Sequence, residues 1–210
     1  MKDETIEHLK NVEVPIDRAK AALNRYAYPD TTRTVILAGT IDQLFEHHEA
    51  MLLSIRNGKT GSAFALARGI VEGMYTGLWL NFCATDAQVE KFERKDDLPL
   101  TMAGLAAAID EKYRAEGFFA DLKTRTWPAL CSYTHTGMLQ IGRRFTGHKV
   151  EPSYRDSEIV EVTVTVTTCI LLLVAKFLAV QQHPEATKEI EALIGTYHPK
   201  AAQGTVQPVA

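Results

Sequence analysis

Residues 67–80, ARGIVEGMYTGLWL, decide the fold, because they have the pattern of a helix that is apolar on nearly every side. Only Arg68 and Glu72 carry charge, and glycine recurs at every fourth position, at 69, 73 and 77. A helix of this kind is buried in the middle of a bundle. Each glycine inside a helix costs about 1 kcal/mol relative to alanine. We therefore expect another helix, from this chain or from a second copy, to approach closely along the glycine stripe.

The two charged residues of this helix lie on one stripe, because they are four positions apart. An unpaired charge in a protein interior costs several kcal/mol, so Arg68 and Glu72 are expected to be partly buried and to pair with each other. Two interpretations stay open. The pair can be an ion pair that fixes how helices cross, or it can be part of a polar pocket in the core.

The pattern outside this stretch predicts an all-α, single-domain bundle of six to seven helices over residues 1–198. Residues 199–210 are predicted to form a disordered tail. Proline, glycine and capping residues place the boundaries. The predicted helices are residues 4–26 with an irregularity near Pro15, 32–57, 61–84, 85–94 after a capping box at Thr85, 99–117, 118–146 with a break at Trp127-Pro128, 157–182 and 184–197.

The segment VEVTVTVTT, residues 160–168, alternates apolar and polar residues as a half-buried strand does. No second strand signal exists elsewhere in the sequence to pair with it. An isolated strand would leave its backbone hydrogen bonds without partners. We therefore favour a helix that continues into the apolar run CILLLVAKFLAV.

The composition is that of a soluble globular protein, with 46% hydrophobic and 23% charged residues among 210. A net charge of −3 is too small to indicate nucleic acid or membrane as an obligatory partner. The three cysteines show no CxxC spacing, which fits the reducing cytoplasm. The adjacent histidines of EHHE, residues 46–49, point about 100° apart on a helix, so neither a metal site nor a cofactor is predicted.

A basic segment between Asp121 and Glu151 contains no acidic residue. Guanidinium groups suit phosphate and other anions, so this segment could bind RNA or a nucleotide. The equally weighted alternative is a face that docks against acidic neighbouring helices. The basic residues are Lys123, Arg125, Arg143, Arg144 and Lys149, with His135 and His148.

His135 is expected on the apolar face of a helix over residues 128–146, as a hydrogen-bonded core residue. If it meets the stripe of Arg68 and Glu72, the three side chains form a small buried constellation that is able to move a proton.

The order of these features resembles helical bacterial proteins of unknown function. They carry Arg-x-x-x-Glu in an apolar helix, here Arg68 and Glu72, and then a helix with a histidine, here Ser132-Tyr133-Thr134-His135. Such proteins are distantly similar to the HEPN superfamily, whose active members resemble metal-independent ribonucleases of toxin–antitoxin and phage-defence systems. Arg143 and His148 fit the Arg-x4-His spacing of those enzymes, and the resemblance implies that they are catalytic.

Two hypotheses about function result. In the first, the chain is a HEPN-like accessory or defence-type protein that binds or cleaves RNA. A histidine would take the proton from a ribose 2′-hydroxyl, and an arginine would stabilise the transition state. In the second, it is a non-catalytic helical interaction or scaffold module, in which the same polar groups only orient helices. A cytoplasmic homodimer with no membrane contact is expected in both.

Overall fold

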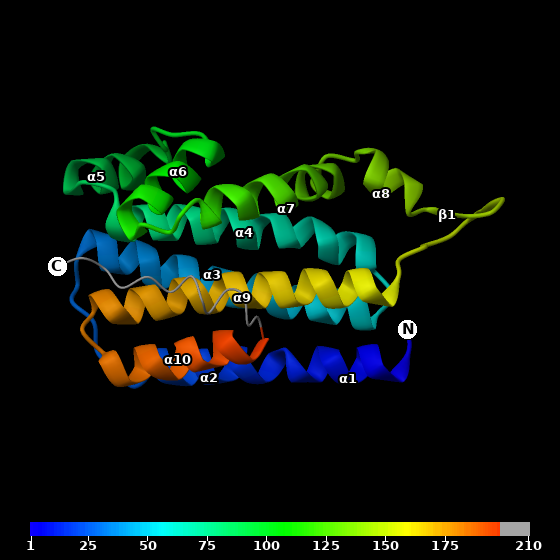
Figure 1. The fold of residues 1–210 in the computed structure, drawn as a ribbon, viewed down its shortest axis with the longest axis horizontal. Coiled ribbons are helices and arrows are strands. Elements are labelled where there is room, and N and C mark those ends of the chain that lie inside the picture. The colour runs from blue at the N-terminus through cyan, green and yellow to red at the C-terminus, as the bar shows by residue number, and fades with distance from the viewer. Residues whose placement is uncertain (198–210) are drawn as a thin grey trace.

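The computed structural model describes residues 1–197, and this part of the chain is almost entirely helical (Figure 1). This confirms the all-α fold, with somewhat more helices than the six to seven predicted; the predicted tail, residues 199–210, lies outside the described residues. The elements are α1 (Asp3–Asn11), α2 (Glu13–Leu23), α3 (Thr32–Arg56), α4 (Thr60–Phe82), α5 (Asp86–Lys95), α6 (Met102–Tyr113), α7 (Phe118–Thr134), α8 (Met138–Gly142), β1 (Phe145–Thr146), β2 (Lys149–Val150), α9 (Asp156–Val180) and α10 (Pro184–Tyr197).

The glycine-rich helix α4 lies at the centre and packs against α3, α6, α7 and α9. A methyl group on Gly73 would lie 2.6 Å from Leu44 Cδ2 in α3. One on Gly77 would lie 2.8 Å from Leu173 Cδ1 in α9. Carbon atoms in contact are normally about 3.5–4.0 Å apart. The glycine stripe is therefore closely packed at these two positions, by leucine side chains from helices of the same chain.

The run VEVTVTVTT is helical, as favoured, and forms the first half of α9. Its threonines Thr163 and Thr167 are four residues apart and share a face of the helix. The Thr163 hydroxyl is within hydrogen-bond distance of the Ile159 carbonyl at 2.8 Å and is hydrogen-bonded to Nε2 of His8 at 2.8 Å. Thr167 is hydrogen-bonded to Nε2 of the buried His48 at 2.9 Å. These two polar residues of the run thus connect α9 to α1 and α3.

Within the described residues, α9 is the one helix long and apolar enough to cross a bilayer by length and hydropathy. In the bundle, 78% of its most apolar 18-residue window is buried. The helix packs against α1, α2, α3, α4 and α10. Most of its apolar surface is therefore covered by other helices of the same chain.

The N-terminal helix, expected over residues 4–26, is divided into α1 and α2, which meet at Val12. Pro15 lies three residues beyond this junction and explains the interruption. It has no amide hydrogen to donate to the carbonyl of Asn11, and its ring crowds that carbonyl. That carbonyl accepts a hydrogen bond from the Tyr197 hydroxyl of α10 at 2.8 Å. The interruption is therefore stabilised from another helix.

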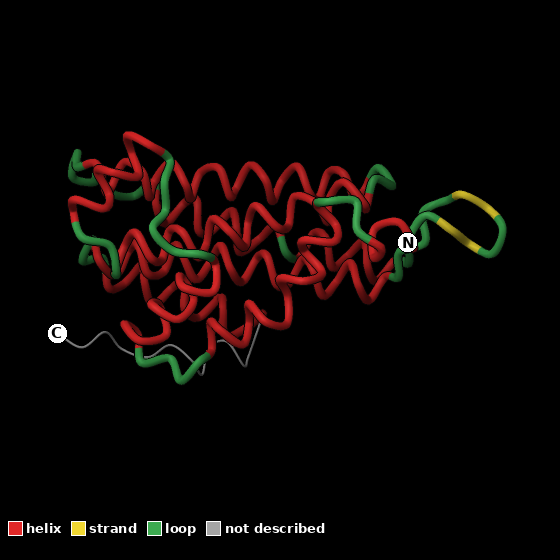
Figure 2. The backbone as a smooth tube through the Cα atoms, turned by 90° about the horizontal axis from the view of Figure 1, so that it is seen from above, coloured by secondary structure: helices red, strands yellow, loops and turns green. Residues whose placement is uncertain are grey.

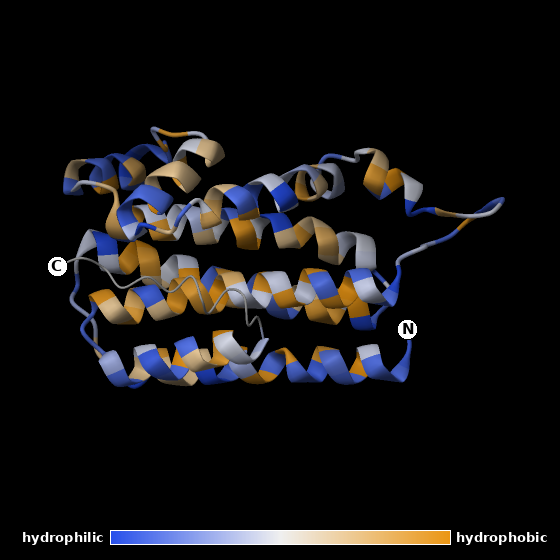
Figure 3. Cartoon of the chain, viewed as in Figure 1, coloured by the Kyte–Doolittle hydropathy of each residue, from blue (hydrophilic) through white to orange (hydrophobic). Residues whose placement is uncertain are grey.

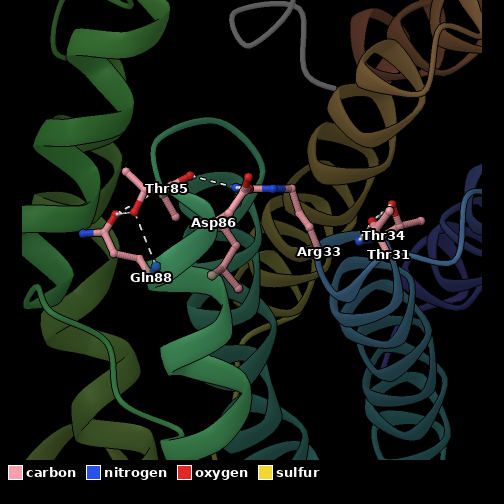
Figure 4. Close-up of polar contacts among 8 residues, drawn as sticks. Thr31, Arg33, Thr34, Thr85, Asp86 and Gln88 are labelled. Carbon is pink, nitrogen blue, oxygen red and sulfur yellow. Dashed lines mark hydrogen bonds and ion pairs between the residues drawn. The ribbon is translucent and has the colours of Figure 1, made fainter.

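The predicted capping box at the start of α5 is present (Figure 4). The Thr85 amide donates to Gln88 Oε1 at 2.8 Å, and the Gln88 amide donates to Thr85 Oγ1 at 3.4 Å. Arg33 of α3 reaches this point, where it pairs with Asp86 at 2.7 Å and donates to the Ala84 carbonyl at 2.9 Å. The beginning of α5 is thereby fixed against α3.

The helix expected over residues 118–146 is shorter, and the break expected at Trp127-Pro128 is absent. α7 continues through Pro128, where Thr124 and Pro128 are both exposed, so water can satisfy the carbonyl that loses its amide partner. The helix ends at Thr134, because Thr136 takes a left-handed φ of 55°. A Cβ on Gly137 would lie 2.8 Å from the Cα of Ser132, so the chain turns where only glycine fits.

Residues 138–150, named the arm from here on, follow this turn and consist of α8 and the antiparallel ribbon of β1 and β2. Gly147, expected to end a helix, is in the turn of the ribbon with a φ of 60°. Phe145 pairs with Val150 across the ribbon, and Thr146 pairs with Lys149. Both views show the ribbon projecting beyond the end of the bundle (Figure 1, Figure 2).

Candidate functional site

Polar side chains gather along the seam between α4 and α7, called the α4–α7 seam below. Arg68 of α4 donates from Nη1 to Nε2 of His135, which directly follows α7. Its guanidinium carbon lies 4.9 Å from the ring centroid of Trp127 in α7. Its Nε lies 3.5 Å from Oε2 of Glu72. The structure therefore brings Arg68, Glu72 and His135 together, with Trp127 as a fourth member.

This seam lies near the surface, and not in the core. The Arg68 side chain is 18% exposed and the Glu72 side chain 43% exposed. His135 was expected on a buried helical face, but it is exposed because α7 ends one residue before it. The constellation is thus half-buried, with Arg68 as its least exposed member.

The contact between Arg68 and His135 limits the roles that the two ring nitrogens can have. A guanidinium group has only donors and keeps its proton in proteins. Nε2 of His135 must therefore act as the acceptor, which leaves the ring proton of a neutral imidazole on Nδ1. A neutral imidazole with a free Nδ1–H can donate to a ligand or exchange a proton with one.

A cavity of about 400 Å³ lies beside this seam. Glu72 and Thr76 of α4 line one side, and Lys123 and Trp127 of α7 line the other. The residues before α6 complete it, including the N-terminal cap Thr101. The cavity therefore presents one carboxylate, one ammonium group and one aromatic ring to a ligand.

The other members of the basic segment point in different directions. Arg125, on α7, pairs with Asp121 at 2.7 Å. Arg143 pairs with Glu158 of α9, which also accepts from Arg155 at 2.9 Å. Burial alone would raise the pKa of the Glu158 carboxyl, but the hydrogen bonds and charges of the two arginines hold it below its usual range. The segment forms two ion pairs and no continuous basic face.

Arg144, His148 and Lys149 complete the basic segment. Arg144 lies against Gly61 at the start of α4, next to the hydroxyl of Tyr154. His148 and Lys149 are exposed on the ribbon of the arm. These positions differ from the expectation because residues 143–150 are not helical.

Arg143 and His148 do not converge. The Arg143 carbonyl accepts from the Ser153 amide at 2.8 Å, at the base of the ribbon. His148 is in the turn at the opposite end, next to Gly147. Four extended residues span roughly 13 Å. The side chain of Arg143 is moreover held by Glu158. The spacing that fits Arg-x4-His in the sequence therefore does not form a two-residue site.

The two histidines of EHHE diverge as predicted for a helix. His48 is buried and bonds Thr167, whereas His47 lies against Gly69 of α4. Among residues 1–197, no group of three or more histidine, cysteine, aspartate or glutamate side chains is placed to hold a metal ion.

Two features of this surface escaped the sequence reasoning. The sequence reasoning treats Trp127 only as a helix breaker, although it lies on α7 about two turns before His135. The arm carries exposed apolar side chains, and the cartoon of the arm in Figure 3 has both hydrophobic and hydrophilic colours. The sequence signals for the arm are the two turn dipeptides Thr136-Gly137 and Thr146-Gly147.

No curated protein and no solved structure matches the chain. A protein-family match covers residues 41–202, which include α4, the α4–α7 seam, the arm and α9. By this match the chain belongs to DUF6988, a family of unknown function.

Proposed function

We propose that this protein is a non-catalytic helical interaction module that binds a protein partner through the arm. Exposed apolar side chains are concentrated there. Met138 is 75% exposed, Phe145 49% and Val150 79%, and Leu139 and Ile141 are exposed as well. Single exposed apolar residues are ordinary, but five of them within one short segment of the chain favour a contact surface. An isolated two-stranded ribbon is only marginally stable in water, so a partner would also stabilise the ribbon itself.

The geometry gives less support to the HEPN-like alternative, metal-independent cleavage of RNA. That mechanism needs an arginine and a histidine on one phosphate group. Arg143 is neutralised by Glu158, and His148 is at the far end of the ribbon. The interaction module needs neither residue in a catalytic position.

Photo-cross-linking tests the proposed function. A photoreactive amino acid replaces Phe145 in the full chain, in the cells that naturally produce it. The matched control carries it at Leu53, which is 62% exposed on α3 and outside the arm. Irradiation is expected to give protein adducts from position 145 only. RNA adducts at 145, or equal protein adducts from both positions, would contradict the proposal.

A nucleotide bound at the α4–α7 seam is a second candidate, which the adjacent cavity favours. A volume of about 400 Å³ suits a small ligand. Lys123 can contact a phosphate group, the ring of Trp127 can stack on a base, and Glu72 can accept from an amino group.

Fluorescence titration with mononucleotides tests this candidate, because Trp127 is at the cavity. Quenching that saturates in the wild type is expected to weaken in Lys123→Met. It should persist in Lys59→Met, which removes an exposed lysine at the beginning of α4. Absence of saturable quenching in the wild type would rule out the nucleotide.

A further inference from the structure

The partner of the arm can be inferred from a second surface of the same chain. This inference rests on the proposed function and adds the identity of the partner. Two adjoining cavities, of about 180 and 430 Å³, form a groove between α7 and α9. They share lining residues from both helices, including Arg125, Thr126, Glu161 and Thr165.

The floor and walls of the groove are mainly apolar. Val71 and Met74 of α4 form part of the floor. Val160 and Val164 line the α9 side, and Leu122 lines the α7 side. Apolar surface of this shape suits apolar side chains on a narrow element, because such an element can enter between two helices without displacing them.

The arm presents such side chains on one face. Phe145 and Val150 are directly opposite each other, so both project from the same side of the ribbon. The ribbon extends beyond the end of the bundle (Figure 1, Figure 2). A second copy of the chain offers the same groove to this arm, and its own arm to the first groove.

The charges of the two surfaces are complementary. Lys149, on the other face of the ribbon, has no ion-pair partner within residues 1–197, and its long side chain can reach sideways to a rim. At the groove, Glu158 is occupied by Arg143 and Arg155. Glu161 is exposed and, in the described part of the chain, makes no ion pair. It is therefore the carboxylate available to a lysine from outside.

We propose that two copies of this chain exchange arms. Phe145 and Val150 of each copy lie in the groove between α7 and α9 of the other, with Lys149 opposite Glu161 at the rim. The contact is made twice, because a twofold axis relates the copies. The arm is then covered, and so is the groove.

Charge reversal tests this exchange on the full chain. Lys149→Glu and Glu161→Lys each place like charges at both contacts of a homodimer, so each should raise its dissociation constant about tenfold or more. Mixing the two variants places opposite charges at both contacts and should restore the wild-type dissociation constant. Glu90→Lys, an exposed position on α5, is the control and should not restore it when mixed with Lys149→Glu.

Light scattering on a sizing column and native mass spectrometry read the outcome, with one variant tagged so that mixed dimers have a distinct mass. The wild type should have twice the chain mass of 23.3 kDa. Phe145→Ser/Val150→Ser should be monomeric, and Leu53→Ser should remain dimeric.

A monomeric wild type would overturn the exchange, and so would a dimer that is indifferent to both charge reversals. Heterologous protein adducts at position 145 with a monomeric wild type would leave the interaction module standing with a different partner. Absence of any adduct at 145 would remove both proposals.

Discussion

Burial of His48 makes the stability of the bundle depend on pH in a way that can be calculated. Burial lowers the pKa of this imidazole from 6.5 to about 4, although Glu13 and Glu49 act in the opposite direction and Lys20 adds to the decrease. The unfolded chain therefore takes up a proton between pH 6.5 and 4 that the folded chain does not. The stabilisation is complete above pH 6.5 and is lost as the pH falls. With 1.36 kcal/mol per pKa unit, the loss is about 2 kcal/mol at pH 5 and about 3 kcal/mol at pH 4.

Urea unfolding of the wild type and of His48→Gln isolates this contribution. Glutamine keeps a hydrogen-bonding group for Thr167 and removes the titration, while His8 and the carboxyl groups remain in both chains. When the pH falls from 7.5 to 4, the free energy of unfolding of the wild type should decrease by about 3 kcal/mol more than that of the variant. Parallel pH profiles would refute the reasoning, because they would mean that His48 is protonated in the folded protein.

Four other substitutions are checked by the same unfolding measurement. Gly73→Leu should lower the free energy of unfolding by about 1–3 kcal/mol through overpacking. Gly39→Ala should raise it by up to about 1 kcal/mol, because a Cβ at this position has no atom within 4 Å. A Gly73→Leu variant that is more stable than the wild type would contradict close packing. Glu72→Ala should cost about 1 kcal/mol or less, because its carboxylate is 43% exposed; a loss of several kcal/mol would show that Arg68 depends on it. Arg33→Met should cost about 2 kcal/mol, since it removes charged hydrogen bonds to Leu80, Ala84 and Asp86; an unchanged midpoint would show that these bonds are solvated.

The sequence was sufficient for the features that depend on strong local signals. The apolar pattern with three spaced glycines predicted a central helix, and α4 is central. The capping box at Thr85 predicted the start of α5. The helix predicted for residues 160–168 depended on the absence of a partner strand in the sequence. That reasoning is general, because the backbone amides and carbonyls of any segment need hydrogen-bond partners.

The end of α7 could not be predicted in the same way. Trp127-Pro128 is a stronger breaker by rule than Thr136-Gly137, yet the helix passes the first and stops at the second. The helix continues through Pro128 because Thr124 and Pro128 are exposed, so that water can replace the amide partner that the Thr124 carbonyl loses. The contact between Gly137 and Ser132 decides the second, and it exists only once the turn has formed. The positions of Arg143 and His148 depended on this one boundary.

The contact between His135 and Arg68 is predicted by the sequence only on the condition that the two helices face each other there. Spacing places Arg68 and Glu72 on one stripe of α4, but it does not say which face of α7 lies opposite. That choice depends on helix packing, which residue spacing does not encode. The same holds for the groove between α7 and α9, since it is a space that two helices leave between them.

Amide hydrogen exchange of the arm tests the central claim most directly. A free two-stranded ribbon opens readily and exchanges fast, whereas a ribbon held in a groove is protected. Residues 144–151 of the wild type should exchange at least about tenfold more slowly than those of Lys149→Glu at equal concentration, and adding the Glu161→Lys chain should restore the protection. Core amides of α9 serve as the reference. Fast exchange of the arm in the wild type, unchanged by either variant, would contradict the claim that the arm is a binding surface covered by a second copy.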